Sequence, residues 1–139
     1  MKKYLHPTDE AAMKLFSSGQ QGEIVMLNLL RFNEIADYSE STELKPSKEI
    51  SGEQAYQLYM QHTAPFLKES GGELILYGEC KDYFIGPVDE SWDVAMLVKQ
   101  NSLQDFLAFA TNEEYLKILG HRTAALADSR LLPITPKQI

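Results

Sequence analysis

The sequence predicts an α+β protein with one four-stranded antiparallel sheet, two main helices on one face and an additional N-terminal helix. The chain has 139 residues, the length of a single domain, and we expect residues 1–139 to form one. It is 44% hydrophobic and 24% charged, as soluble globular proteins are. From residue 23 onward the predicted elements run strand, helix, strand, strand, helix, strand. This is the split βαβ order of ferredoxin-like domains.

The first 22 residues are expected to form an add-on helix. Thr8 is a favourable N-cap, the two acids after it match the positive end of the helix dipole, and Gly19 ends the apolar pattern. Residues 23–132 then make up the ferredoxin-like core, and residues 133–139 a tail.

The first core strand is predicted at residues 24–32, an apolar run that is too short for a typical buried helix. Residues 33–51 are mostly polar, so we expect a long irregular connection there. Ser51 and Gln54 form a capping box, after which apolar residues recur at helical spacing. Pro65 removes one backbone hydrogen bond, which predicts a kink or break in the last turns.

The second half of the chain predicts two more strands, a helical region and a final strand. Residues 74–77 and 83–85 are interpreted as parts of a second strand interrupted at Gly78, and residues 92–99 as the third. The final strand is expected at residues 130–132.

The helical region is expected in pieces. It opens at Ser102, restarts at Asn112 and continues past a weak point at Gly120 toward Ala127. Pro133 is expected to end the final strand, because proline cannot donate to a ladder.

Both faces of the predicted sheet are apolar, although two helices cover only one. Apolar residues fill both alternating sets of positions in the strands at 24–32 and 92–99. A four-stranded face measures roughly 300 Å², at the upper end of what monomers leave exposed. We therefore predict a homodimer with its sheets face to face. The alternative is that the N-terminal helix or the 33–51 connection covers the second face within one chain.

Charge and composition exclude several partners. Twenty acidic against thirteen basic residues give a formal net charge of −7, the wrong sign for nucleic acid or an anionic membrane surface. No apolar run approaches membrane-spanning length, and the N-terminus does not resemble a secretory signal. One cysteine cannot form an internal disulfide, so a cytoplasmic protein is the simplest expectation.

Candidate binding groups occur on the first strand and the main helix. Asn28 interrupts an apolar strand, so its amide either bonds a neighbour or faces a wet cleft. Tyr56, Tyr59 and His62 are spaced three apart on one helix and could bind or move a proton on a small enol or phenol. The stronger alternative is that these aromatics are core, with His62 at the solvent edge.

Asp93 and Arg122 complete the candidate set. Asp93 is a candidate general base if it faces a cleft, and otherwise a strand-end acid paired with a lysine. Arg122 could hold a substrate carboxylate, although structural bonds between helix and loop are the commoner use of such an arginine. His62 and Asp93 are thus the catalytic candidates, and the others are candidates for substrate binding.

Metal, phosphate and thiol chemistry have no motif in the chain. The three histidines are too scattered for a zinc site, and no glycine-rich phosphate loop occurs. Cys80 is expected to be a structural thiol. We therefore expect no cofactor and no metal.

Several short segments between residues 23 and 132 match a known pattern in order and spacing: 26–32, the Tyr56 and Tyr59 pair, Gly71-Gly72, Trp92-Asp93-Val94, Ser102 before Phe106, Glu114-Tyr115, and Arg122 ahead of 125–131. Together they resemble the family of uncharacterised proteins called domain of unknown function 1330, in the dimeric α/β-barrel superfamily. The resemblance implies a ferredoxin-like fold and a sheet-to-sheet dimer. It implies no catalytic residues, because that family has no settled activity. Cofactor-free and haem-binding enzymes of the wider superfamily are analogous in fold alone.

Two classes of function fit these residues. The first is a small-molecule-binding protein, or a cofactor-independent enzyme acting on a small enolisable or phenolic compound, with its pocket between sheet and helices. The alternative is a non-catalytic dimeric structural or interaction module. Haem binding is less favoured, since only His62 or His121 could supply an axial ligand.

Overall fold

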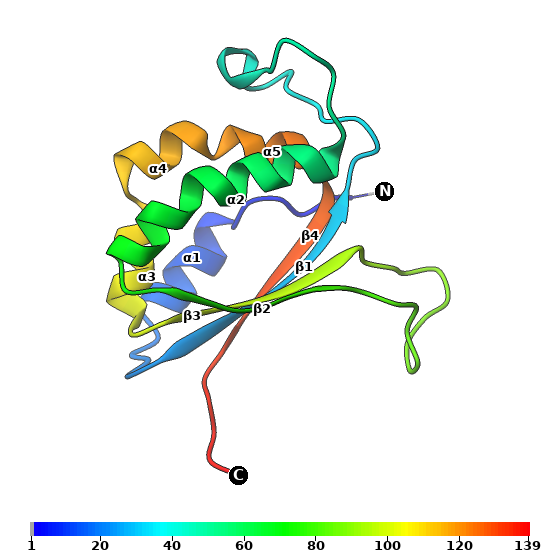
Figure 1. Ribbon diagram of the computed structural model, residues 1–139. Helices are drawn as coiled ribbons and strands as arrows, with labels where there is room; N and C mark the ends of the chain where they lie inside the picture. Colours follow the sequence, from blue (N-terminus) through cyan, green and yellow to red (C-terminus); the bar gives the residue numbers. More distant parts are fainter. Residues whose placement is uncertain (1) are drawn as a thin grey trace.

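The computed structural model describes residues 2–139. Figure 1 shows helices stacked on one side of a twisted sheet. The elements in chain order are α1 (Asp9–Phe16), β1 (Ile24–Phe32), a short 3-10 helix (Thr42–Leu44), α2 (Gly52–Glu69), β2 (Glu73–Glu79), β3 (Val94–Gln100), α3 (Leu103–Ala110), α4 (Glu113–Ile118), α5 (Gly120–Ala125) and β4 (Leu126–Ile134).

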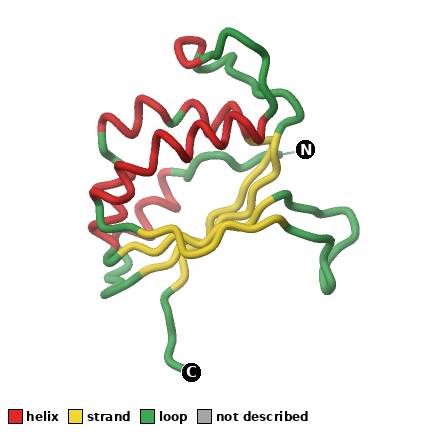
Figure 2. Tube along the Cα trace, viewed as in Figure 1, coloured by secondary structure: helices red, strands yellow, loops and turns green. Residues whose placement is uncertain are grey.

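The four strands form one antiparallel sheet in the order β2-β3-β1-β4. At its centre Asn28 of β1 lies between Met96 of β3 and Leu131 of β4. All the helices lie on the same side of the sheet (Figure 2). The predicted ferredoxin-like α+β fold is confirmed.

The main core lies between the sheet and the helices α2, α4 and α5. Its fully buried members include Leu30 of β1, Ala55 and Tyr56 of α2, and Ala125 and Leu126 where α5 passes into β4. Burying side chains of this kind contributes roughly 1.5–3 kcal/mol each for the large ones. This packing fixes α2 across the middle of the sheet.

The N-terminal helix packs on the same side as the other helices. A second cluster joins Ile24 and Met26 of β1 to Leu103 of α3, and Phe16 of α1 packs against it. The rings of Phe16 and Phe106 stack with their centroids 6.0 Å apart. The add-on helix therefore does not cover the second face of the sheet, as the single-chain alternative requires.

The 33–51 connection is tied to the helix side by backbone hydrogen bonds. The amide of Asn33 donates to Ala125 at 2.8 Å, and that of Asp37 donates to Ala124 at 2.9 Å. The amide of Gly52, where α2 begins, in turn donates to the carbonyl of Asn33 at 3.0 Å. These bonds hold the long connection against α5, away from the second sheet face.

Three local expectations were wrong. α2 runs without a break through Pro65, which lies only one turn from the end of the helix. β2 continues through Gly78, whereas residues 83–85 lie in the loop before β3 and add no strand. β4 continues through Pro133, because β4 is an edge strand and has a partner on one side only.

The face of the sheet that points away from the helices is called the outer face. By the strand register its apolar side chains are Val25, Leu27 and Leu29 of β1, Leu97 of β3, Leu76 of β2, and Leu132 and Ile134 of β4. Leu76 and Leu132 are 52% and 57% exposed, and the β1 residues are half-buried. Within residues 2–139, no helix packs on this face.

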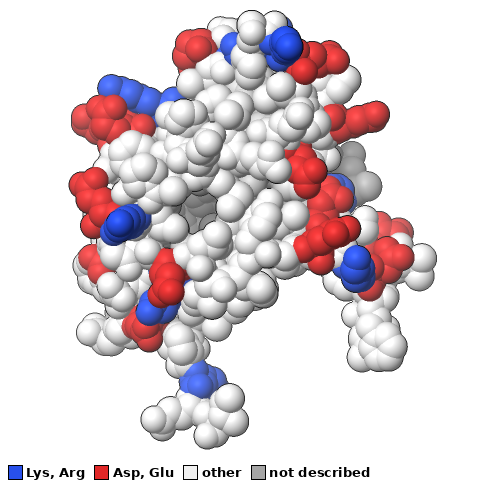
Figure 3. All heavy atoms as spheres, viewed as in Figure 1, with Lys and Arg blue, Asp and Glu red and all other residues white. Residues whose placement is uncertain are grey.

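Acidic side chains are spread over several elements on the side of the molecule shown in Figure 3, and basic residues form no patch there. This distribution agrees with the formal net charge of −7. None of the helices within residues 2–139 has both the length and the apolar character needed to cross a bilayer.

Candidate functional site

A cavity of about 410 Å³ opens where the first turns of α2 face the end of the sheet. The residues that line it come from four places: Phe32 of β1, Glu53 and Gln57 of α2, Tyr77 and Glu79 of β2, and Cys80, Asp93 and Val94 around the loop before β3. Three of them are carboxylates, and no lysine or arginine of residues 2–139 lines the cavity. We call it the acidic cavity.

Asp93 is held at the mouth of this cavity by backbone hydrogen bonds. Its carboxylate accepts the amide of Phe32 at 2.8 Å, and its own amide donates to Leu30 at 2.8 Å. Its carbonyl accepts the amide of Cys80 at 2.9 Å. Asp93 is exposed and forms no ion pair with a lysine among residues 2–139. It is a strand-end acid whose carboxylate accepts the last backbone amide of β1 and also lines the cavity.

The phenol of Tyr77 and the thiol of Cys80, which also line the cavity, stay protonated at neutral pH. Burial, together with the negative charge of Glu53, raises the pKa of Tyr77. Burial and the carboxylate of Asp93 raise the pKa of the Cys80 thiol. A thiol with a raised pKa is a poor nucleophile, so nothing here favours covalent chemistry at Cys80.

Tyr56 and Tyr59 lie in the core beneath α2. The Tyr59 hydroxyl is 2.7 Å from that of Tyr115 on α4, and one donates to the other. The ring of Tyr56 packs on Phe32 and Tyr59, with centroids 5.7 and 5.2 Å away. Burial raises the pKa of all three phenols, so they are neutral hydrogen-bonding groups of the interior.

Arg122 is used in structural bonds between distant segments. Its guanidinium donates to the carbonyl of Leu5 at 2.6 Å and to the hydroxyl of Ser129 at 3.4 Å. The first joins α5 to the N-terminal segment, and the second joins it to β4. These bonds use two of the five donors of the guanidinium, in the structural role that is the commoner use of such an arginine.

Asn28 and His62 occupy two further places. Asn28 is buried on the helix side of the sheet, and its amide nitrogen donates to the carbonyl of Met26 on its own strand at 3.2 Å. His62 is exposed on α2, and its ring stacks on His121 of α5 with centroids 5.6 Å apart. His121 is buried, and its Nδ1 lies 2.7 Å from the Tyr38 hydroxyl of the 33–51 connection. Neither histidine lines the acidic cavity.

The six residues predicted as a site do not form one group, although Arg122 lies close enough to the Tyr56 and Tyr59 phenols to lower the pKa of both. Tyr56, Tyr59 and Arg122 belong to the interior beneath the helices, and among the six only Asp93 lines the acidic cavity. Groups of three or more histidine, cysteine or carboxylate side chains suited to a metal ion do not occur within residues 2–139.

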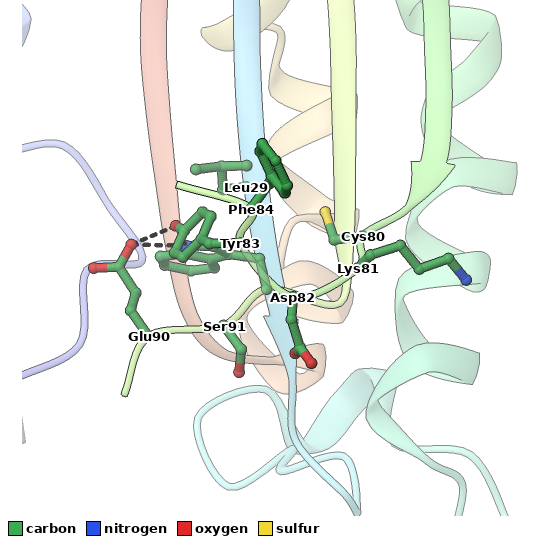
Figure 4. Close-up of a pocket in the computed structure, with 9 residues that line it drawn as sticks. Leu29, Cys80, Lys81, Asp82, Tyr83, Phe84, Glu90 and Ser91 are labelled. Atoms are coloured by element: carbon green, nitrogen blue, oxygen red, sulfur yellow. Dashed lines mark hydrogen bonds between the residues drawn. The ribbon is translucent and has the colours of Figure 1, made fainter. Parts of the chain in front are cut away.

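A second hollow, of about 290 Å³, lies against the outer face of the sheet. Leu29 of β1 forms one wall, and residues of the loop between β2 and β3, among them Tyr83, Phe84 and Trp92, form the other. Figure 4 shows Phe84 beside Leu29, and Tyr83 turned toward Glu90. Cys80 lines both hollows.

Two solved structures of one protein resemble this chain over nearly its whole length. The crystal structure of the methylated RPA0582 protein has 30% sequence identity and a TM-score of 0.89, and the match covers 99% of this chain and 98% of that one. The chain belongs to the RPA0582 family. A second crystal structure of RPA0582, from Rhodopseudomonas palustris and described as a protein of unknown function, is 29% identical, with a TM-score of 0.89 over 99% of this chain and 100% of that one.

The RPA0582 family shares its fold with more distant proteins. A DABB family protein with a ferredoxin-like fold, from Mesorhizobium loti, matches with a TM-score of 0.53 and 8% identity over 85% of this chain and 100% of that one, which shows the fold alone. No family model and no curated protein matches the chain. The resemblance to domain of unknown function 1330 thus stays a prediction, while membership of the RPA0582 family is established.

The sequence did not single out two residues that shape the acidic cavity of this RPA0582 family member. Glu53 lies in the first turn of α2, where acids are common because of the helix dipole, so its position carried no functional signal. Tyr77 lies in the edge strand β2 and has the residue type that strands prefer. Only the packing of α2 over the end of the sheet shows that they share a cavity with Asp93.

Proposed function

We propose that this protein works as a homodimer in which the outer faces of two sheets pack against each other. The observation that supports it is the unpartnered outer face, which carries seven apolar side chains from four strands. The N-terminal helix and the 33–51 connection both pack on the helix side. An apolar face of this extent is at the upper end of what monomers leave in water, and patches of that size often mark interfaces.

Leu132 of β4 tests this proposal. It is 57% exposed on the outer face, so in a twofold dimer each copy buries about half of a leucine against its partner. In Leu132→Glu the interface loses this burial twice and gains two unpaired carboxylates, each of which costs several kcal/mol to desolvate. At about 1.4 kcal/mol per tenfold, the dissociation constant should rise on the order of a thousandfold.

The matched control is Leu116→Glu, because Leu116 is 47% exposed and lies on α4, on the helix side. Sedimentation equilibrium at micromolar concentration should give twice the 15.8 kDa chain mass for the wild type and for the control, and the chain mass for Leu132→Glu. A wild-type protein that sediments as a monomer at tens of micromolar would contradict the proposal.

We propose as a second function that the acidic cavity binds a small organic molecule. The supporting observation is its lining, which combines the rings of Phe32 and Tyr77 with the carboxylates of Glu53, Glu79 and Asp93. Carboxylates only accept hydrogen bonds, so a complementary ligand must bring O–H or N–H donors. A small phenol or aromatic amine meets both conditions, with its ring against the aromatic walls and its donor on a carboxylate.

Proton transfer in this cavity could involve Asp93 alone among the predicted catalytic residues. His62 stacks on His121 and does not line the cavity, so the predicted pair does not act together here. The geometry therefore supports binding better than acid–base catalysis. A candidate base must lie within hydrogen-bond reach of the proton that it removes.

A ligand panel with one charge-neutralising variant tests the second function. We expect small phenols and aromatic amines to raise the melting temperature of the wild type, and aromatic carboxylates to leave it unchanged. Glu53→Gln should weaken binding about tenfold, since a hydrogen bond to a charged group contributes roughly 1.5–3 kcal/mol. Glu113→Gln is the control, because Glu113 also lies in the first turn of a helix and does not line the cavity. Equal binding by both variants would place the ligand elsewhere.

A further inference from the structure

The loop between β2 and β3, residues 80–93, projects from the end of the sheet and bends away from the helices (Figure 1). We call it the arm. Its base is closed by the bond from the Cys80 amide to the Asp93 carbonyl at 2.9 Å. The indole of Trp92 donates to the Tyr83 hydroxyl at 2.8 Å, and that hydroxyl donates to Glu90 at 2.5 Å. These bonds give the arm a defined shape.

The tip of the arm is apolar and is almost fully exposed within residues 2–139. Phe84 is 99% exposed, Ile85 88% and Val88 104%. Figure 3 shows that the far end of the arm carries no charged side chain. Three large apolar side chains this exposed within five residues of one loop place much apolar surface in water, and such exposed apolar surface marks interaction sites.

The arm also faces the side of the sheet that lacks a cover. Phe84 and Leu29 line the same hollow of about 290 Å³, and Leu29 belongs to the outer face. The arm therefore overhangs the outer face and leaves a gap beside it (Figure 4). An object packed on the outer face would meet the tip of the arm.

The exposed apolar areas of the outer face and the arm tip favour a second copy of this chain as the partner that covers the outer face. A large aliphatic or aromatic side chain contributes on the order of 100 Å² of apolar surface, so the seven partly exposed residues of the outer face offer about 300 Å². A standard interface buries about 800 Å² per partner, of which roughly 450–500 Å² is apolar. The outer face alone falls short of this, whereas the three tip residues add about 300 Å² more.

We infer that the arm of each subunit packs its tip, Phe84, Ile85 and Val88, against the other subunit of the homodimer. This inference rests on the proposed dimer and adds the element that completes its interface. In a twofold dimer each tip contact occurs twice, so the two arms contact the partner subunits at symmetry-related places.

Two tip variants with a matched control test the inference. Ile85→Asp and Val88→Asp each place a charge on the tip and remove an apolar side chain that is almost fully exposed in the monomer. Each should raise the dimer dissociation constant at least tenfold, measured by sedimentation velocity over a dilution series. Met13→Asp is the control, because Met13 is 72% exposed on α1, on the helix side, and this variant should keep the wild-type constant.

Fluorescence gives an independent measurement. Trp92 is the single tryptophan of the chain and lies at the base of the arm. Its emission should change on dilution through the dissociation constant in the wild type, and the midpoint should move to higher concentration in both tip variants. Far-ultraviolet circular dichroism confirms that each variant is folded.

The outcomes separate the inference from the proposed dimer. Weaker dimers for both tip variants, with an unchanged control, support the arm contact. Tip variants that dimerise as tightly as the wild type overturn the arm contact and leave the sheet-to-sheet dimer standing. A monomeric wild type overturns both.

Discussion

Gly52 sits where three parts of the chain meet beside the acidic cavity, and Gly52→Ala tests that packing. A Cβ at this position would lie 2.5 Å from the carbonyl oxygen of Ala125 and closer still to that of Asn33, whereas ordinary contacts begin at 3.4 Å. Both oxygens belong to backbone held by hydrogen bonds, Asn33 to Ala125 at 2.8 Å and Gly52 to Asn33 at 3.0 Å. The added methyl therefore has to separate α2 from the ends of β1 and α5.

The expected cost follows from those two bonds. Each backbone hydrogen bond contributes about 1 kcal/mol net, and overpacking adds roughly 1–3 kcal/mol. Alanine recovers up to about 1 kcal/mol through its higher helix propensity. The variant should thus unfold with about 2–4 kcal/mol less stability, which is a melting temperature lower by roughly 5–15 °C.

Gly78→Ala is the control, because a Cβ on Gly78 meets no atom of residues 2–139 within 4 Å. Urea unfolding at one protein concentration should give Gly78→Ala a stability within about 1 kcal/mol of the wild type. If Gly52→Ala proved as stable as that control, the close junction of α2, β1 and α5 would be wrong, and with it the placing of Glu53 opposite Asp93.

Two further predictions concern pH. Burial, together with the neighbouring His62, lowers the pKa of His121 below its ordinary value, so the unfolded chain binds a proton there more readily than the folded chain does. The free energy of unfolding should therefore fall as pH drops from about 7 through 6.5. Tyr38→Phe removes the hydrogen-bond partner of the His121 Nδ1 and should lower the free energy of unfolding by about 1–2 kcal/mol at pH 7.5, measured by urea unfolding. Burial opposes ionisation of Asp128, but the Tyr4 amide and the Arg130 guanidinium outweigh it and hold the pKa of that carboxyl below its usual range. Its contribution is present above about pH 4 and is lost as pH falls below that value, so Asp128→Asn should flatten the acid limb of a stability profile; an unchanged limb would show that Asp128 is not ion-paired.

The elements predicted well are those whose signals are local. β1 was predicted at residues 24–32 and is found there, because its apolar run is long and sharply bounded. The capping box at Ser51 and Gln54 is present, with both reciprocal hydrogen bonds, and it starts α2 at the expected place. Such signals depend only on neighbours a few residues away.

The errors arise where the structure of a segment depends on a partner that is distant in the sequence. Residues 83–85 have the composition of a strand, but Tyr83 bonds Glu90 and Trp92 and finds no strand to pair with. Pro133 would stop a central strand, and only the strand order shows that β4 is at an edge. Local composition carries neither fact.

The candidate site shows the same division. The sequence places Asp93 near the start of a strand and Arg122 on a helix, but it cannot show that Arg122 would bond Leu5, 117 residues earlier. Nor does it show that Tyr115 would take the hydroxyl of Tyr59. Each partner gives a candidate group a structural role that its residue type alone does not reveal.

These partners also explain where binding capacity remains. Three polar groups beneath the helices already have partners: Tyr59 bonds Tyr115, His121 bonds Tyr38, and Arg122 bonds the N-terminal segment, whereas the buried hydroxyl of Thr63 has none within residues 2–139. Since a satisfied buried group gains little from a ligand, a ligand that entered there would first have to break bonds of the fold. Free acceptors remain in the acidic cavity, and free apolar surface remains on the outer face and the arm. The proposed small-molecule site and the proposed dimer interface therefore lie on opposite sides of the sheet, and a variant of one should leave the other unchanged.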